Sequence, residues 1–454
     1  MPPSEANPVR STAVGSGDVL PRVKVAAASA APAAPAPARV SGERVAPIAT
    51  YREEAVVDRV VVPASRRYIR RAEFLPFSPP VIGEEEVTEV VDTLRSDWLT
   101  TGPKTRCFEQ EFAHYVGAQG ALALNSCTAG LHTSLVALGT GAGDEVITTP
   151  MTFAATVNVI EHVGARPVLV DVEPDTLNID PVEIERAITP RTKAIIAVHY
   201  SGHPADLDAI EAIAARHGLA VIEDAAHALP AWYRGRMIGA GENPTAFSFY
   251  ATKNLTTAEG GMLTGSAEFL ERARPVSLHG MTRDALRRYE RGGSWRYEIL
   301  SPGFKYNMTD IQAAMGRCQL RKLERFDARR REVVAAYHAA FGESDALELP
   351  VERPDVRHAW HLYVLRLRPE ALRIGRDRFI DELAQRNIGT SVHFIPVHLH
   401  PYYRDRYGWT PTDFPVAYEA FERMLSLPLN PRLTGRDVDD VITAVLDVVR
   451  TYRR

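Results

Sequence analysis

A lone lysine, Lys253, follows the apolar run AFSFYAT (246–252) and precedes two threonines and a glycine pair. The run predicts a buried strand at 247–250, with Ser248 and Lys253 on either side of its carboxyl end. A lysine placed there can be a nucleophile, a phosphate ligand or an ordinary surface residue. Lysine has a reference pKa of about 10.4, and desolvation or a neighbouring cation lowers that value in catalytic lysines. The residues that follow the other predicted strands distinguish between these interpretations.

Polar or aromatic residues also follow two other predicted strands. Asp224 and His227 lie in DAAHA (224–228), directly after LAVIE (219–223). They can serve chemistry, or Asp224 can cap the next helix while His227 is a core histidine. Phe153 follows EVITT (145–149), and it can belong to the core or stack on a planar ring.

The stretch NSCTAGLH (125–132) follows the apolar run ALAL (121–124). Hydroxyls and small residues at a strand-to-helix turn leave backbone N–H groups free, and the helix dipole there favours an anion. The alternative is ordinary helix capping by Ser126 or Thr128.

Short apolar strands alternate with helical stretches, which predicts an α/β fold with a mostly parallel sheet between helices. In such a sheet the carboxyl ends of the strands form the ligand-binding edge. The strands are expected at 121–124, 145–149, 167–172, 193–198, 219–223 and 247–250, and helices at 83–99, 105–117, 131–139, 153–164 and 207–218.

The chain divides into three predicted parts. Residues 1–72 contain the Ala/Pro-rich stretch VAAASAAPAAPAPA, which predicts a disordered tail. Residues 73–320 form the large domain and residues 321–454 a smaller α/β domain. In the latter region we expect a long helix at 307–341, strands at 360–367 and 390–397, and helices at 377–387 and 437–452.

An anion cup, a carboxylate, a flat stacking side chain and a lysine at one sheet edge match the needs of pyridoxal 5′-phosphate. The cup takes the phosphate, and the lysine forms a Schiff base with the aldehyde. The carboxylate keeps the pyridine nitrogen protonated, so that the ring accepts electrons from a developing carbanion.

Competing classes lack their motifs. The glycines of GTGAGDE (139–145) follow a predicted helix, whereas a dinucleotide fingerprint follows a strand, and no GxxxxGK[ST] occurs. His393, His398 and His400 lack a carboxylate or cysteine at metal-ligand spacing, so we expect no metal. A net charge of −4 disfavours nucleic acid, no apolar run spans a membrane, and three scattered cysteines fit a cytoplasmic protein.

Over about residues 73–452 the chain resembles the DegT/StrS-like sugar aminotransferases, which are pyridoxal phosphate enzymes of fold type I. The resemblance rests on these motifs, in family order: TTGPKTRCFE (100–109), NSCTAGLH, GDEVITTPMTF, GARPVLVDV, EDAAHA, FSFYATKNLTTAEGG, GFKYNMTDIQAAMG and SVHFIPVH.

The resemblance implies a role for each candidate residue. Lys253 carries the cofactor and shuttles a proton, and Asp224 pairs with the pyridine nitrogen. His227 lies near the phenolic oxygen of the ring, and Phe153 stacks on it. Thr128, Ala129 and Ser248 bind the phosphate. Asn307 reaches the phosphate of a second subunit, which implies a homodimer.

Two departures from the common family pattern bear on the substrate. This chain has AEGG (258–261) where many members have GEGG, and KYN (305–307) where many have NxR. Both variants resemble the branch that aminates C4 of UDP-linked 4-keto sugars, such as UDP-4-amino-4-deoxy-L-arabinose synthase. A nucleotide-linked sugar acceptor and L-glutamate as amino donor are therefore expected. The alternatives are a GDP- or dTDP-linked keto sugar and an aminocyclitol ketone.

Two other function classes fit the residues of this chain poorly. Non-catalytic binding proteins on this fold usually lose the lysine or the carboxylate, whereas this chain keeps Lys253 and Asp224. A desulfurase needs a mobile catalytic cysteine, but Cys127 falls in the predicted cup and Cys318 in a predicted helix.

Overall fold

The computed structural model describes residues 68–282 and 296–454, which belong to one compact unit. The disordered tail predicted at 1–72 lies outside these ranges except for residues 68–72, and it stays a prediction.

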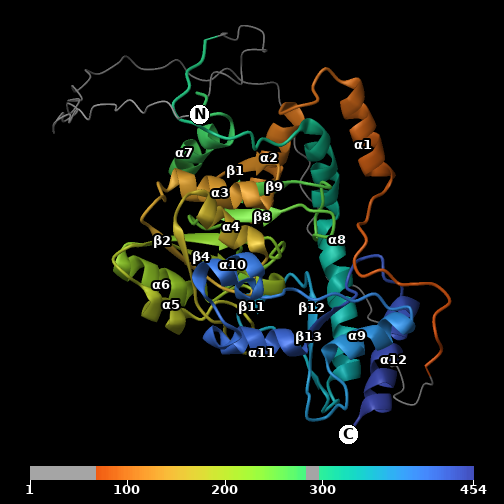
Figure 1. Cartoon of the computed structure of the whole chain (residues 1–454). Coiled ribbons are helices and arrows are strands. Elements are labelled where there is room, and N and C mark those ends of the chain that lie inside the picture. Colours follow the sequence, from red (N-terminus) through yellow and green to blue (C-terminus); the bar gives the residue numbers. More distant parts are fainter. Residues whose placement is uncertain (1–67, 283–295) are drawn as a thin grey trace, which may run out of the picture. The chain divides into compact units, whose positions relative to one another are not determined.

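The central sheet has the strand order β1-β9-β8-β5-β4-β2-β3. Figure 1 labels β1, β9, β8, β4 and β2 of this sheet. Six strands run in one direction, and β9 is antiparallel to both of its neighbours. The mostly parallel α/β fold is thereby confirmed. The strands are β1 (Ala121–Leu124), β2 (Glu145–Thr148), β3 (Arg166–Leu169), β4 (Thr192–Val198), β5 (Ala220–Asp224), β8 (Thr245–Ser248) and β9 (Gly261–Thr264).

Helices cover both faces of this sheet because successive strand residues point in opposite directions. Val146 and Ile196 pack with α3, α4 and α7, whereas their neighbours Ile147 and Ile195 pack with α5 and α6. The covering helices are α2 (Pro103–Val116), α3 (Cys127–Ala137), α4 (Ala154–His162), α5 (Pro181–Ala187), α6 (Leu207–His217) and α7 (Ala267–Ser277).

The long helix α8 (Asp310–Phe341) joins the two predicted domains (Figure 1). Its start is capped by Thr309, whose Oγ1 accepts the Gln312 backbone N–H at 3.3 Å. Its first half packs against α1 (Glu84–Arg95) and α2, and its second half against α12 (Gly435–Tyr452). The predicted division at residue 320 falls inside this helix and stays a prediction.

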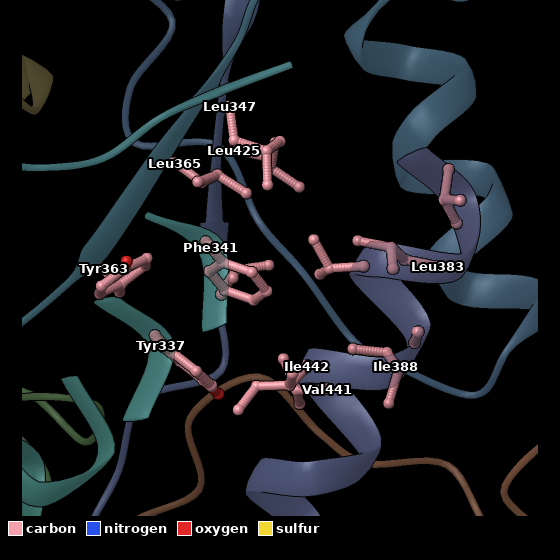
Figure 2. Close-up of a cluster of buried hydrophobic side chains, with 14 of the residues drawn as sticks. Tyr337, Phe341, Leu347, Tyr363, Leu365, Leu383, Ile388, Leu425, Val441 and Ile442 are labelled. Atoms are coloured by element: carbon pink, nitrogen blue, oxygen red, sulfur yellow. The ribbon is translucent and has the colours of Figure 1, made fainter. Parts of the chain in front are cut away.

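The second half of α8 contributes Tyr337 and Phe341 to a separate core, shown in Figure 2. The same core takes Tyr363 from β12 and Leu383 from α9, both fully buried. The elements of this part are β10 (Leu347–Glu348), β12 (Tyr363–Leu367), β13 (Met424–Leu427), α9 (Arg376–Gln385), α10 (Pro401–Tyr407), α11 (Pro415–Arg423) and α12. Outside it lie β6 (Trp232–Tyr233), β7 (Arg236–Met237) and β11 (Val356–Arg357), which form a small sheet.

The strand expected at 390–397 is wrong. Only Ser391 pairs with a strand residue, Ser426 of β13, after which the chain leaves the sheet. Pro396 lacks the N–H that would continue a ladder, and Ile395 is 47% exposed. The strand expected at 360–367 begins only at Tyr363, because Trp360 has a φ of 45°.

Neither a membrane-spanning helix nor a metal-binding cluster occurs in the ranges that the structure describes. None of their helices combines the length and apolarity needed to cross a membrane. Nor do they hold a group of three histidine, cysteine, aspartate or glutamate side chains arranged around a metal ion.

Candidate active site

The carboxyl ends of β5 and β8 lie side by side, as the parallel sheet requires. Asp224 is the last residue of β5 and pairs with Ala246 of β8, two residues before Ser248. The chain then turns, and the Lys253 N–H donates to the Tyr250 carbonyl at 2.9 Å. Asp224, Ser248 and Lys253 thus belong to one edge of the sheet, where the sequence analysis expects them.

The lysine turn is fixed by Asn254, the residue that follows Lys253. Its side-chain Nδ2 donates to the carbonyls of Leu229 and Ala359, each at 2.9 Å. Its Oδ1 lies 3.1 Å from Nδ1 of His361, on a segment 107 residues away. Asn254 therefore ties the lysine turn to the chain that leads into β12.

Ala258 and Gly261 shape the return of the chain into β9. Ala258 has a φ of 67°, a left-handed conformation that costs a residue with a Cβ about 1–2 kcal/mol. A Cβ on Gly261 would lie 2.4 Å from the carbonyl carbon of Ser126, so only glycine fits there. The departure from GEGG thus falls at the position where glycine is conformationally favoured.

The amine of Lys253 loses its proton more easily than that of an ordinary lysine. Burial lowers its pKa to about 8, although the nearby Cys127 and Asp224 act in the opposite direction. At pH 7, one unit below this pKa, roughly a tenth of the amine is neutral, and the neutral form is the nucleophile.

We expect the reactivity of Lys253 toward an amine-specific acylating reagent to rise about tenfold per pH unit and to level off near pH 8. The measurement is the labelling rate of the cofactor-free protein, resolved by peptide mass spectrometry. Exposed lysines in the same sample are the internal control. A midpoint for Lys253 above pH 10 would show that its amine is solvated like theirs.

Asp224 is 5% exposed and accepts hydrogen bonds at both carboxylate oxygens. Thr156 Oγ1 donates to Oδ2 at 2.7 Å, and the Ala226 N–H donates to Oδ1 at 3.1 Å. Cys127 Sγ lies 3.8 Å from Oδ1. Burial raises the pKa of the Cys127 thiol well above its usual value, which does not suit a catalytic thiolate.

His227 is buried, and its Nδ1 has no hydrogen-bond partner among the described residues. Burial lowers the pKa of His227 well below its usual value, so the ring is neutral at neutral pH. It stacks on Phe394, with ring centres 5.7 Å apart, and lies 4.4 Å from the ring of His361. This nitrogen is therefore available to a polar group of a bound ligand.

Phe153 is the residue before α4 and is 65% exposed, so it is not a core residue. Its ring centre lies 6.0 Å from that of Phe394. An exposed aromatic side chain at the ligand-binding edge is free to stack on a planar ring.

The anion cup predicted at 125–132 coincides with the start of α3, and its role in anion binding stays a prediction. Ser126 caps the helix, since its Oγ accepts the Ala129 N–H at 3.0 Å. Thr128 is half-buried in the first turn, and Ala129 is buried behind it. Capping and anion binding are compatible here, because the other N–H groups of the first turn have no partner within the helix.

Asn307 lies beside β1, pairing with Leu124, and its Nδ2 donates to Thr101 Oγ1 at 2.7 Å. The preceding Tyr306 hydroxyl lies 3.0 Å from Nδ1 of His132 on α3. Within one chain this loop therefore flanks the cup at the outer strand of the sheet.

A family model for the DegT/DnrJ/EryC1/StrS aminotransferases matches residues 80–446. The chain belongs to this family.

Two curated relatives are similar over 84% of this chain. MJ1066 of Methanocaldococcus jannaschii is 54% identical, with its whole length covered. The spore coat polysaccharide biosynthesis protein SpsC of Bacillus subtilis is 53% identical, with 98% covered. Among solved structures, Spr1654 of Streptococcus pneumoniae, described as a sugar aminotransferase, has a TM-score of 0.78 at 37% identity, covering 83% of this chain and 99% of that one.

Structures of Spr1654 exist in a pyridoxal phosphate form and a pyridoxamine phosphate form. The residues of this chain fit the same cofactor, because they offer a low-pKa amine, a hydrogen-bonded carboxylate and an unpartnered histidine nitrogen. The protein is therefore a pyridoxal phosphate-dependent sugar aminotransferase, which acts on a sugar and an amino donor.

Sequence reasoning missed three residues that contact the expected ones. Thr156 could have been found, because it lies one turn beyond Phe153 at the start of a predicted helix. Asn254 directly follows Lys253, but nothing in its local pattern shows a structural role. His361 gives no signal, because only the fold brings it to Asn254 and His227.

Proposed function

We propose that this enzyme transfers the amino group of L-glutamate to C4 of a UDP-linked 4-keto sugar. The observation that carries the transamination is the placement of a lysine with a pKa of about 8 at the sheet edge that also holds Asp224. The acceptor is proposed from the two family variants, AEGG at 258–261 and KYN at 305–307.

Bound pyridoxal phosphate supplies an electron-withdrawing ring that stabilises negative charge at the carbon of the reacting substrate. Lys253 Nζ would hold the cofactor and would accept and return the proton of the substrate Cα. The Asp224 carboxylate would accept the hydrogen bond of the pyridine N–H, and neutral His227 would lie near the phenolic oxygen. Phe153 would stack on the ring.

The phosphate is assigned to the first turn of α3. Thr128 and Ala129 lie there, and Ser248 ends the neighbouring strand β8. A helix start offers free N–H groups and a positive dipole end to the phosphate.

A homodimer in the cytoplasm completes the proposal. Asn307 of one subunit would reach the phosphate in the other, from a loop at the outer strand of the sheet. Exposed apolar side chains near this loop, Ile299 and Leu300 at 57% and 63%, support a subunit contact there. Residues 73–320 and 321–454 are proposed as the large and small domains.

The acceptor test presents the pyridoxamine form of the enzyme with a panel of keto substrates. We expect UDP-4-keto sugars to restore the pyridoxal absorbance faster than dTDP- or GDP-linked keto sugars and aminocyclitol ketones. The spectrum is followed by stopped flow, and the aminated product is identified by mass spectrometry. Preference for another nucleotide would replace the acceptor, whereas failure of L-glutamate to form the pyridoxamine form would overturn the donor.

A further inference from the structure

A buried line of hydroxyl groups runs from Thr152, two residues before α4, through Thr156 on α4 to Asp224. Thr152 Oγ1 and Thr156 Oγ1 are 2.7 Å apart, and Thr156 Oγ1 is 2.7 Å from Asp224 Oδ2. Both threonines are nearly inaccessible, at 2% and 1% exposed. Hydrogen bonds that involve an ionised group in such a site are stronger than those between neutral groups.

The direction of these bonds follows from counting protons. A carboxylate only accepts, so Thr156 must give its single hydroxyl proton to Asp224. Thr156 then has only lone pairs left for Thr152, and Thr152 must donate to it. The donated hydrogen bonds therefore run from Thr152 through Thr156 to Asp224, and Asp224 Oδ2 accepts the last of them.

The second oxygen of Asp224 is held less firmly by side chains. Cys127 Sγ lies 3.8 Å from Oδ1 but only 3.4 Å from the Ala246 carbonyl, so its one weak donor has a nearer acceptor. The remaining contact to Oδ1 is the backbone N–H of Ala226. Among the described residues, Thr156 makes the shortest side-chain hydrogen bond to this carboxylate.

We propose that Thr156, oriented by Thr152, is a positioning residue that fixes the Asp224 carboxylate toward the pyridine nitrogen. This inference rests on the role proposed above for Asp224. Thr156 is the third residue of α4, and Phe153 directly precedes this helix, so the residue that stacks on the ring and the residue that orients the Asp224 carboxylate lie at the same helix start. The start of this helix therefore fixes both the side chain that stacks on the ring and, through Thr156, the carboxylate that faces the ring nitrogen.

The test compares Thr156→Val, which keeps the side-chain shape, with Thr156→Ser, which keeps the hydroxyl. We expect Thr156→Val to weaken pyridoxal phosphate binding and to slow the L-glutamate half-reaction, each by about tenfold or more, and Thr156→Ser to restore most of both. The pH profile of the visible absorbance of bound cofactor should shift in Thr156→Val and not in Thr156→Ser.

A matched control is Thr133→Val on α3, since Thr133 Oγ1 is buried without a hydrogen-bond partner among the described residues. It should leave binding, rate and pH profile unchanged. If Thr156→Val does not fold, Thr152→Val gives the same test, because it leaves Thr156 without its orienting donor. We expect it to shift the same quantities in the same direction by a smaller factor.

The inference is overturned if Thr156→Val lowers the melting temperature but leaves the dissociation constant and the pH profile as in the wild type. Asp224→Asn separates this outcome from failure of the proposed function. An impaired Asp224→Asn with an unaffected Thr156→Val refutes the positioning role alone. An Asp224→Asn enzyme that reacts like the wild type refutes the assignment of the carboxylate and, with it, the inference.

Discussion

Replacing Lys253 by alanine should abolish transamination while leaving the fold intact. Proton transfer by a positioned side chain contributes about 10²–10⁴-fold, and the variant also loses the amine that holds the cofactor. Stopped-flow absorbance after mixing with L-glutamate measures the half-reaction. The purified variant should also lack the yellow colour of the wild type.

Two comparisons make the Lys253 prediction specific. Lys193→Ala removes an exposed lysine near the amino end of β4 and should change neither the colour nor the rate. A small primary amine in solution should restore part of the rate of Lys253→Ala, because it supplies the missing base. A Lys253→Ala enzyme that converts glutamate at the wild-type rate would remove Lys253 from the mechanism.

Asp224→Asn should lower the rate of the glutamate half-reaction by about 10²–10³-fold, as is typical when an electrostatic contact in an active site is lost. The amide is close in shape but carries no charge, so it no longer keeps the pyridine nitrogen protonated. Lys253 is unchanged, and the cofactor should remain attached with an altered absorbance spectrum. The rate and the spectrum are measured on the same preparation.

Glu223→Gln is the matched control for Asp224→Asn. Glu223 precedes Asp224 on β5 and is equally buried, but its Oε2 lies 3.0 Å from His199 Nε2. Adjacent strand residues point to opposite faces, so this change should affect stability more than rate. Equal losses of rate in the two variants would mean that a buried charge on β5 matters, rather than the position of Asp224.

Much of the architecture could be predicted because it depends on local pattern. Apolar runs such as ALAL at 121–124 form buried strands wherever helices separate them, and β1 occupies the predicted residues. Parallel strands then bring their carboxyl ends to one edge, which placed Asp224, Ser248 and Lys253 together without knowledge of the packing. The antiparallel strand β9 was missed, since GMLT at 261–264 is short and shows no alternation of apolar and polar residues that would indicate a strand.

The segment 390–397 shows why pattern alone fails. Its β-branched and aromatic residues favour a strand, but only Ser391 finds a partner in β13. Phe394 instead lies between Phe153 and His227, where it belongs to the candidate site. A high strand propensity means that a residue fits a pleated, half-buried surface. Whether a segment of such residues joins a sheet depends on a neighbouring strand that can pair with it.

The sequence by itself determined which groups this protein has for its chemistry, namely an amine, a carboxylate and an anion cup at strand ends. Residue type and chain order carry that information. The tertiary structure alone decided the environment of these groups: the burial that lowers the pKa of Lys253, the hydroxyl of Thr156 on Asp224, and the contact of His361 with Asn254. Such contacts join residues 68 or 107 positions apart, and packing, which no local pattern encodes, brings them together.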